Sequence, residues 1–255
     1  PVVTFNGMYS LESVDMSAPY YNIESNYADY MEWMNESMEN LDGAPIYGQA
    51  TIDLWRSKEK DPDGIAESGY PNKVAYPNTD WYDAIYKTKL MQEHSVSVTG
   101  TEGRSNYALG MTYLDNPGII DGAGQKKYSI NLKLTTNITD WLQVGGHIWG
   151  YHQDRGRNSV GNLTAWSFLK AVPGMYPYYD GRFGGPEAVE EDGSISSPLQ
   201  QINPTYNDSY YRMNRLFTTT HVQVKFLKDF TGREVVSHGD TDLAVAKGAA
   251  RSEER

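Results

Sequence analysis

Cysteine is absent from this chain. Its absence excludes disulfide frameworks and metal sites that are built from thiolates. Basic residues are scarce as well, because 22 Lys and Arg stand against 33 Asp and Glu, which gives a formal net charge of −11. Nucleic-acid binding requires a basic patch that neutralises phosphates, so this charge argues against a nucleic-acid partner.

Long apolar runs are also missing. A helix that crosses a bilayer needs about 20 consecutive apolar residues, and the chain holds no such run. This excludes a protein that spans a membrane with helices, whereas the strands of a β-barrel are individually weak signals and remain open. The chain begins at Pro1, without an initiator Met or a signal peptide, which indicates a processed chain or a fragment.

Aromatic residues, by contrast, are abundant, since the 255 residues include 20 Tyr and 6 Trp. A chain of this length suffices for one large β domain or two ordinary ones. Tyr and Trp at this density suit two settings, the aromatic girdles of membrane barrels and protein surfaces that stack on sugars. Composition alone does not separate the two settings.

One segment alternates without error between apolar and polar residues. In residues 127–135, one face carries Tyr128, Ile130, Leu132 and Leu134, and the polar residues between them share the other face. The length is near the roughly 9 to 11 residues that a tilted strand needs to cross a bilayer. A half-buried strand of a soluble sheet shows the same alternation. The period therefore predicts a strand and leaves its surroundings open.

Short and long connections alternate between the predicted strands. Tight turns are expected at residues 101–104, 137–140 and 227–229. The connections between them are longer and rich in aromatic residues. An antiparallel meander with short connections at one end and long connections at the other is the plan of outer-membrane β-barrels.

The pattern also predicts which strands pair. Residues 95–99 should pair antiparallel with residues 107–113, and residues 128–136 with residues 141–151. Polar residues in mid-strand, such as Lys133, fit the wet lumen of a barrel and equally the solvent face of an ordinary sheet.

The long connections contain helical patterns. A helix is expected from Ser25, a good N-cap, because one helical face then carries Tyr27, Met31, Met34 and Met38. Such a stripe is more often packing than a ligand-binding feature. Further short helices are expected from Thr51, from Thr79 and over residues 163–172.

Several of these segments, taken together, resemble one protein family. The motif at residues 76–83 reads Tyr-Pro-Asn-Thr-Asp-Trp-Tyr-Asp, and further motifs follow at residues 94–102, 106–107, 113–120 and 131–145. In this order they closely resemble the SusC/RagA-like TonB-linked (TonB-dependent) outer-membrane transporters. Each motif is weak alone, whereas the set is specific.

The resemblance implies a fold and a location. The implied fold class is all-β with helical loop insertions, in which the chain forms a partial antiparallel meander from a large transmembrane β-barrel. The implied location is the bacterial cell outer membrane, where outer-membrane lipid surrounds the barrel. The lack of cysteine suits a bacterial envelope protein.

The resemblance also implies import. Members of this family take up glycan fragments, and in some cases peptides, together with a SusD-like surface lipoprotein. Their energy comes from the inner membrane through TonB, which is expected to act through a plug domain that is missing from this chain. The expected ligand is thus an oligosaccharide or a peptide, and neither a cofactor nor a metal is expected.

The family pattern stops near Thr231. Residues 1–231 are expected to form the N-terminal part of the barrel, with strands and long extracellular loops. From Gly232 the period-2 alternation is lost, and the sequence becomes rich in alanine and charge. We therefore expect residues 232–255 to be a divergent tail that is disordered or truncated.

Signals for catalysis are thin. His147 and His152 lie on opposite sides of a predicted strand, so they form no joint metal site. The acidic run at residues 190–192 is typical of a solvated loop rather than of the carboxylate pair of a glycosidase. No enzymatic activity is expected.

Aromatic residues in the connection after Tyr151 are the ligand-binding candidates. Exposed aromatic side chains on outer loops suit sugar recognition, which favours Trp166, Tyr176, Tyr178 and Tyr179 as stacking residues. Two alternatives to a transporter stay open: a secreted, soluble β-sandwich that binds carbohydrate, and a glycan-cleaving enzyme. In a sandwich the apolar face meets a second sheet, whereas in a barrel it meets lipid.

Overall fold

The computed structural model describes residues 1–15, 24–156, 171–185, 197–203, 210–226 and 230–246. The chain divides into two compact units. The first, called the sheet unit, comprises Pro1–Glu12, Thr88–Asn158 and Asp208–Gly248. The second, called the loop unit, comprises Ser13–Lys87, Ser159–Asn207 and Ala249–Arg255.

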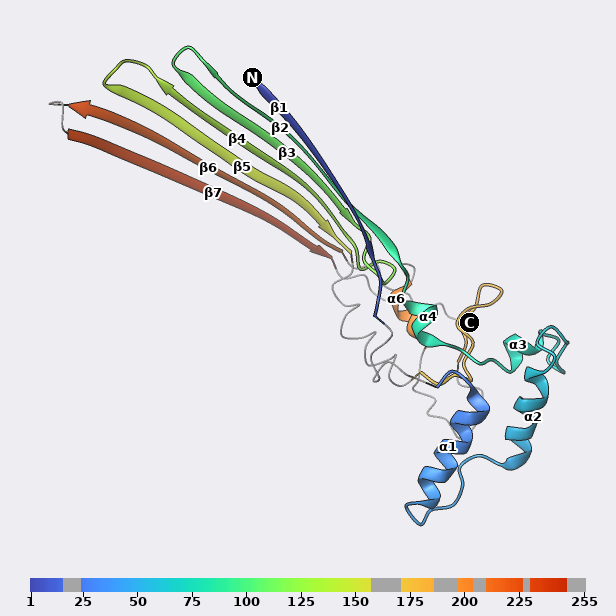
Figure 1. Cartoon of the computed structure of the whole chain (residues 1–255). Helices are drawn as coiled ribbons and strands as arrows, with labels where there is room; N and C mark the ends of the chain where they lie inside the picture. The colour runs from blue at the N-terminus through green and yellow to red at the C-terminus, as the bar shows by residue number, and fades with distance from the viewer. Residues whose placement is uncertain (16–23, 157–170, 186–196, 204–209, 227–229, 247–255) are drawn as a thin grey trace. The chain divides into compact units, whose positions relative to one another are not determined.

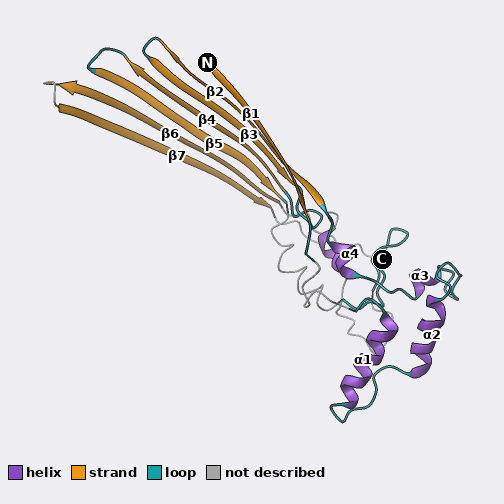
Figure 2. Ribbon diagram, in the orientation of Figure 1, coloured by secondary structure: helices purple, strands orange, loops and turns teal. Residues whose placement is uncertain are grey.

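The sheet unit is one seven-stranded sheet whose strands follow one another in chain order. The strands are β1 (Val2–Glu12), β2 (Lys89–Glu102), β3 (Ser105–Asn116), β4 (Gln125–Asn137), β5 (Leu142–Arg155), β6 (Tyr210–Phe226) and β7 (Phe230–Ala246). All neighbours pair antiparallel, so the sheet is an open meander (Figure 1). The predicted fold class, a partial antiparallel meander with helical loop insertions, is confirmed (Figure 2).

The predicted strand pairings are confirmed in register. Thr99 lies opposite Ala108 in the β2–β3 pair, and Thr136 lies opposite Val144 in the β4–β5 pair. In a meander, alternate connections lie at the same end of the sheet, so the tight turns share one end and the long connections share the other (Figure 1). The third predicted turn, residues 227–229, lies outside the described residues.

Local chemistry explains the tight turns. Gly103 has a φ of 55°, a left-handed conformation that glycine adopts without steric cost. In the β4–β5 turn, Thr139 Oγ1 accepts a hydrogen bond from the backbone N–H of Leu142 at 3.0 Å. The side chains of Arg104 and Asp140 form an ion pair at 3.1 Å between these two neighbouring turns.

At the other end of the sheet, β1 and β2 stay paired to their last residues. Glu12 lies opposite Lys89, and Asn116 Nδ2 donates a hydrogen bond to Glu12 Oε1 at 3.1 Å. The chain segment between these two strands, residues 13–88, therefore begins and ends at one pair of paired strand ends, Glu12 and Lys89, which is called the closed base of this connection.

The register collects apolar side chains on one side of the sheet, called the apolar face. One row across β1 to β5 consists of Val3, Val98, Leu109, Leu132 and Ile148. Val3 is 67% exposed and Leu132 is 38% exposed. A sandwich would place a second sheet over this face, and the described residues form only one sheet.

The opposite side of the sheet, called the polar face, carries the residues between those rows. In the centre of β4 these are Ser129, Asn131 and Lys133. Asn131 Oδ1 lies 3.1 Å from Nε2 of His147 on β5. The contrast between the two faces is that of a barrel wall with lipid on one side and water on the other.

The expected tail boundary at residue 231 is wrong, because β7 runs across it. Residues 230–246 pair with β6 in continuous register. An unpaired strand edge offers backbone N–H and C=O groups to any chain that can extend, whatever its side chains. The loss of alternation is nevertheless real, since β7 brings Glu234, His238 and Asp240 into rows of the apolar face, where Glu234 lies opposite Val222.

The loop unit contains five short helices among its described residues: α1 (Tyr27–Glu39), α2 (Gln49–Glu59), α3 (Asn72–Ala75), α4 (Trp81–Ile85) and α6 (Pro198–Ile202). None of them has the length and apolar character that crossing a membrane requires. The helix expected over residues 163–172 lies almost entirely outside the described residues, and Val172 belongs to no helix.

Helix starts differ from the prediction by one or two residues, and at α1 and α4 a different side chain caps the helix. Asn26, not Ser25, caps α1, because its Oδ1 accepts a hydrogen bond from the N–H of Asp29 at 3.2 Å. Likewise Asp80 caps α4 through the N–H of Asp83 at 3.1 Å. α2 begins at Gln49, before the expected Thr51.

The loop unit has its own core. Large side chains are fully buried there, with Tyr27, Met31, Ile52, Trp81, Ile85 and Met175 as the main members. The Met stripe of α1 is packing, as predicted, because Met31 is buried and Met34 and Met38 are half-buried. The core joins α1 to segments that lie far away in the sequence.

Candidate ligand-binding sites

The loop unit contains a pocket of about 630 Å³ with aromatic walls. Its aromatic lining consists of Trp55, Tyr70, Tyr76, Tyr176, Tyr179 and Phe183. Charged side chains also line it, namely Glu67, Asp180 and Arg182. Aromatic walls with a few polar groups are typical of sites for small organic ligands.

The motif at residues 76–83 holds one wall of this pocket in place. Thr79 Oγ1 donates a hydrogen bond to the carbonyl oxygen of Met175 at 2.7 Å. Trp81 Nε1 donates to the carbonyl oxygen of Val172 at 2.8 Å, and the N–H of Thr79 donates to that of Pro173 at 2.9 Å. These bonds fix the chain immediately before Tyr176, so the motif positions an aromatic residue of the wall.

A tight turn orients the next aromatic residues. Tyr179 and Arg182 exchange backbone hydrogen bonds at 2.8 and 2.9 Å. The two residues between them, Asp180 and Gly181, have positive φ values of 46° and 79°, which is the conformation of a type I′ turn. The turn aims Tyr179 into the pocket, where its ring packs edge-on against Tyr70 at 5.9 Å between centroids.

The structure brings together two of the four predicted stacking residues. Tyr176 and Tyr179 line the pocket and meet edge to face at 6.1 Å. Tyr178 packs on Phe183 at 4.9 Å and does not line the pocket. Trp166 lies outside the described residues. That all four contact a ligand stays a prediction.

Four aromatic wall residues were not among the candidates, namely Tyr76, Phe183, Trp55 and Tyr70. Trp55 lies on α2, and its Nε1 donates to the carbonyl oxygen of Pro77 at 3.2 Å. Tyr70 is 41% exposed, and its ring packs against that of Tyr179, which lies far away in the sequence. Neither Trp55 nor Tyr70 shows a local pattern that indicates a pocket, although the Asp180-Gly181 pair signals the turn that assembles it.

A cation stands close to the same pocket. Lys73 Nζ binds Asp63 Oδ1 at 2.8 Å. This hydrogen bond raises the pKa of Lys73 above its ordinary value, and the phenols of Tyr176 and Tyr179 act in the same direction. Lys73 and Asp63 therefore form an ion pair near two tyrosines of the wall, in which the two charges offset each other.

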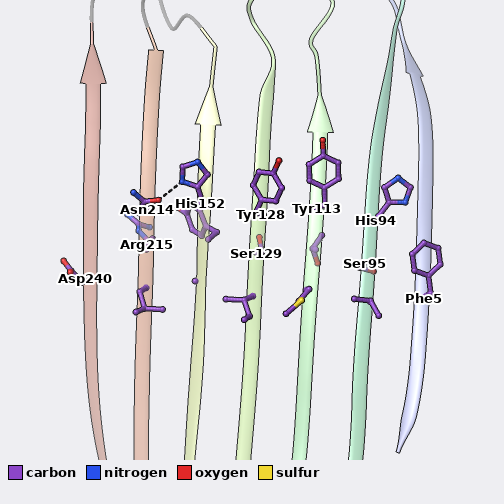
Figure 3. Close-up of a pocket in the computed structure, with 17 residues that line it drawn as sticks. Phe5, His94, Ser95, Tyr113, Tyr128, Ser129, His152, Asn214, Arg215 and Asp240 are labelled. Atoms are coloured by element: carbon purple, nitrogen blue, oxygen red, sulfur yellow. Dashed lines mark hydrogen bonds between the residues drawn. The ribbon is translucent and has the colours of Figure 1, made fainter.

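The apolar face of the sheet unit carries a second hollow, of about 670 Å³ (Figure 3). Its base consists of apolar side chains from five strands, namely Phe5, Val96, Met111, Ile130 and Leu216, and Gly150 leaves room between them. The next row toward the long connections is polar and aromatic, with His94, Tyr113, Tyr128, His152 and Asn214 in register. This order of chemistry suits an amphiphile whose polar group lies in the row.

The polar row is held together by its own contacts. The rings of Tyr113 and Tyr128 lie 5.0 Å apart, and His152 Nδ1 lies 2.6 Å from Asn214 Oδ1, as Figure 3 shows. At the end with the tight turns, Phe226 and Phe230 stack at 5.7 Å. Aromatic side chains thus border the apolar face at both ends, as in the girdles of membrane barrels.

The described residues contain no cluster of three or more His, Asp or Glu side chains that could hold a metal ion.

Sequence comparison finds similar proteins that are named TonB-dependent receptors. The chain is 28% identical over 147 residues to the TonB-dependent receptor P26 of Formosa agariphila, a match that covers 55% of this chain and 14% of that protein. It is 26% identical over 68 residues to the TonB-dependent receptor SusC of Bacteroides thetaiotaomicron, covering 27% of this chain and 7% of that protein. No protein-family model matches the chain.

The fold is similar to that of solved transporters. The RagAB peptide transporter matches with a TM-score of 0.65 at 16% identity, over 96% of this chain and 28% of that chain. The RagAB peptide importer in its open-open state gives a TM-score of 0.67 at 17% identity. At these identities the likeness shows the fold. The chain spans 14% of the length of P26 and 28% of the matched RagAB chain.

Proposed function

We propose that this chain, which belongs to the SusC/RagA-like TonB-dependent receptors of the bacterial outer membrane, takes part in the import of an oligomeric nutrient. The observation that carries the proposal is the open meander, whose apolar face is exposed and whose opposite face carries mainly polar side chains. Such a sheet is part of the wall of a large barrel, with outer-membrane lipid on the apolar face and the transport path on the polar face.

The proposed substrate is a glycan fragment or a peptide. The full-length protein works with a SusD-like surface lipoprotein and receives energy from TonB through a plug domain. It binds and passes its substrate without converting it. The aromatic pocket of the loop unit contributes to capture, with Tyr176 and Tyr179 as wall residues and with Trp166 and Tyr178 as further aromatic residues of the same connection.

Loss of uptake tests this function. A strain that lacks the full-length protein should not grow on the glycan or peptide mixture that induces its expression, and a strain that lacks TonB should show the same defect. The full-length protein should fractionate with the outer membrane and co-purify with the lipoprotein. Secretion of the full-length protein in soluble form, or unchanged uptake without it, would contradict the proposal.

The pocket yields a sharper prediction within the full-length protein. Replacing Tyr179 by Ala should weaken binding of the imported oligomer about tenfold, because an aromatic contact contributes roughly 0.5–1.5 kcal/mol beyond its buried area. Trp33→Ala is the matched control, since Trp33 is an exposed aromatic residue of the same unit and does not line the pocket. Isothermal titration with the oligomer measures both. Equal effects of the two variants would show that the pocket is not the contact surface.

A further inference from the structure

An aromatic cluster lies on the polar face of the sheet, where polar side chains are the rule. Trp149 of β5 and Phe217 of β6 are direct register partners, and their rings stack at 4.5 Å with an interplanar angle of 12°. Tyr151 continues the cluster, at 6.5 Å from Trp149. The apolar face is the other side of the sheet, so contact with lipid does not explain why aromatic residues stand at these positions.

Two cations border this cluster. Lys127 Nζ lies 4.5 Å from the ring centroid of Tyr151. Arg215 Cζ lies 6.0 Å from the same centroid and 5.8 Å from that of Phe217. A guanidinium or ammonium over an aromatic face is held by the ring quadrupole and keeps its hydrogen-bonding groups available.

The charges of these two cations are not neutralised by carboxylates in the described structure. Cations in the rows of the apolar face are paired, as Lys126 is with Asp115 at 3.4 Å and Arg212 with Asp154 at 2.9 Å. Among the described residues, Lys127 and Arg215 form no ion pair. In a chain with a net charge of −11, this places an unpaired positive patch on one face.

Room for a ligand lies next to the patch. Along the row of Trp149, the polar face carries only Asn131, Gly110 and Ser97 toward β2. A Cβ added at Gly110 would meet a single atom within 4 Å, the Cβ of Asn131 at 3.9 Å. The side chains beside the rings are therefore short and leave space above the sheet, and their hydroxyl and amide groups can form hydrogen bonds with a ligand.

We propose that this cluster is a subsite for an acidic oligosaccharide, in which Lys127 and Arg215 bind a carboxylate or sulfate group while Trp149 stacks on a sugar ring. The subsite rests on the proposed function, because only a barrel lumen brings a nutrient to this face. Cations bind such anions through charge-assisted hydrogen bonds, and a flat aromatic face next to hydroxyl and amide groups suits a ring with polar edges. This combination favours an acidic glycan over an acidic peptide.

Binding to the full-length protein in detergent tests the subsite with defined probes. The probes are a galacturonate hexamer, a sulfated galactose hexamer, a neutral galactose hexamer and hexaglutamate. At least one acidic sugar should bind tenfold or more tighter than the neutral one. The double substitution Lys127→Gln and Arg215→Gln should abolish that preference, since a hydrogen bond to a charged group contributes about tenfold or more in affinity.

A matched substitution controls for charge alone. Lys133→Gln removes a positive charge from the same strand and face, and it should change the affinity for the acidic hexamer less than about threefold, because Lys133 lies opposite Ala108 and His147 and not beside Tyr151. An unchanged preference in the double variant would overturn the subsite, as would tighter binding of hexaglutamate or a preference for neutral sugar. If the double variant still imports the nutrient normally, the proposed function stands and only the acidic subsite falls.

Discussion

Replacing Trp81 by Ala should loosen the whole loop unit. Trp81 is 1% exposed, and its indole donates to the carbonyl oxygen of Val172. Truncation of a buried Trp leaves a cavity and an unpaired carbonyl, which should lower the free energy of unfolding of this unit by roughly 3–5 kcal/mol. Hydrogen exchange of α1 and α4 amides in the full-length protein measures this free energy, because the same core holds both helices.

Two further substitutions make this experiment specific. Trp33→Ala removes an indole that is 56% exposed on α1, so its effect should stay within about 0.5 kcal/mol. Trp81→Phe keeps most of the packing and loses the hydrogen bond, which should cost about 1–3 kcal/mol. If Trp81→Ala proves as mild as Trp33→Ala, the motif at residues 76–83 does not organise the unit.

Replacing Leu132 by Arg should oppose insertion of the barrel wall into a bilayer. Leu132 lies in the middle of β4 on the apolar face. A charged residue at the midplane of the lipid face of a barrel costs about 2–4 kcal/mol, and the cost falls to about 0–1 kcal/mol near the interfaces. Folding of the full-length protein into lipid vesicles, followed by denaturant titration, gives this free energy.

The position of the charge decides the interpretation. Val224→Arg places the same charge on the same face close to the tight turns, where the cost should be small. Asn131→Arg places it on the neighbouring residue and the polar face, where it should also be small. A soluble sandwich would penalise a charge along its whole buried face. Equal costs at Leu132 and Val224 would therefore count against lipid as the neighbour of this face.

The sheet could be predicted from the sequence because its signals are local. Residues 127–135 alternate with a period of two, and turn residues such as Gly103 mark where each hairpin reverses. β7 escaped prediction because it pairs through its backbone, while its side chains show no alternation. Alternation of apolar and polar residues indicates a strand only where the two faces of the sheet have different environments, one apolar and one aqueous.

The candidate site was predictable only in part, because it is assembled across the chain. The turn at Asp180-Gly181 is a local signal, and it places Tyr179 correctly. The contact of Tyr179 with Tyr70 is a distant one, and nothing near Tyr70 indicates it. Helix starts were displaced for a different reason: Ser25 and Asn26 are both good caps, and the geometry of the first turn selects between them.

The closed base of the connection between β1 and β2 has a consequence for how such proteins diversify. The sheet keeps its register up to the pair of Glu12 and Lys89, and Asn116 holds that pair from the neighbouring strand. Residues 13–88 can therefore be lengthened, shortened or exchanged by recombination without moving any side chain of the wall to the other face. Proteins that share this sheet can therefore change their substrates through residues 13–88, whereas substitutions in the lipid-facing strands are more strictly limited because those strands must keep their register and their apolar face.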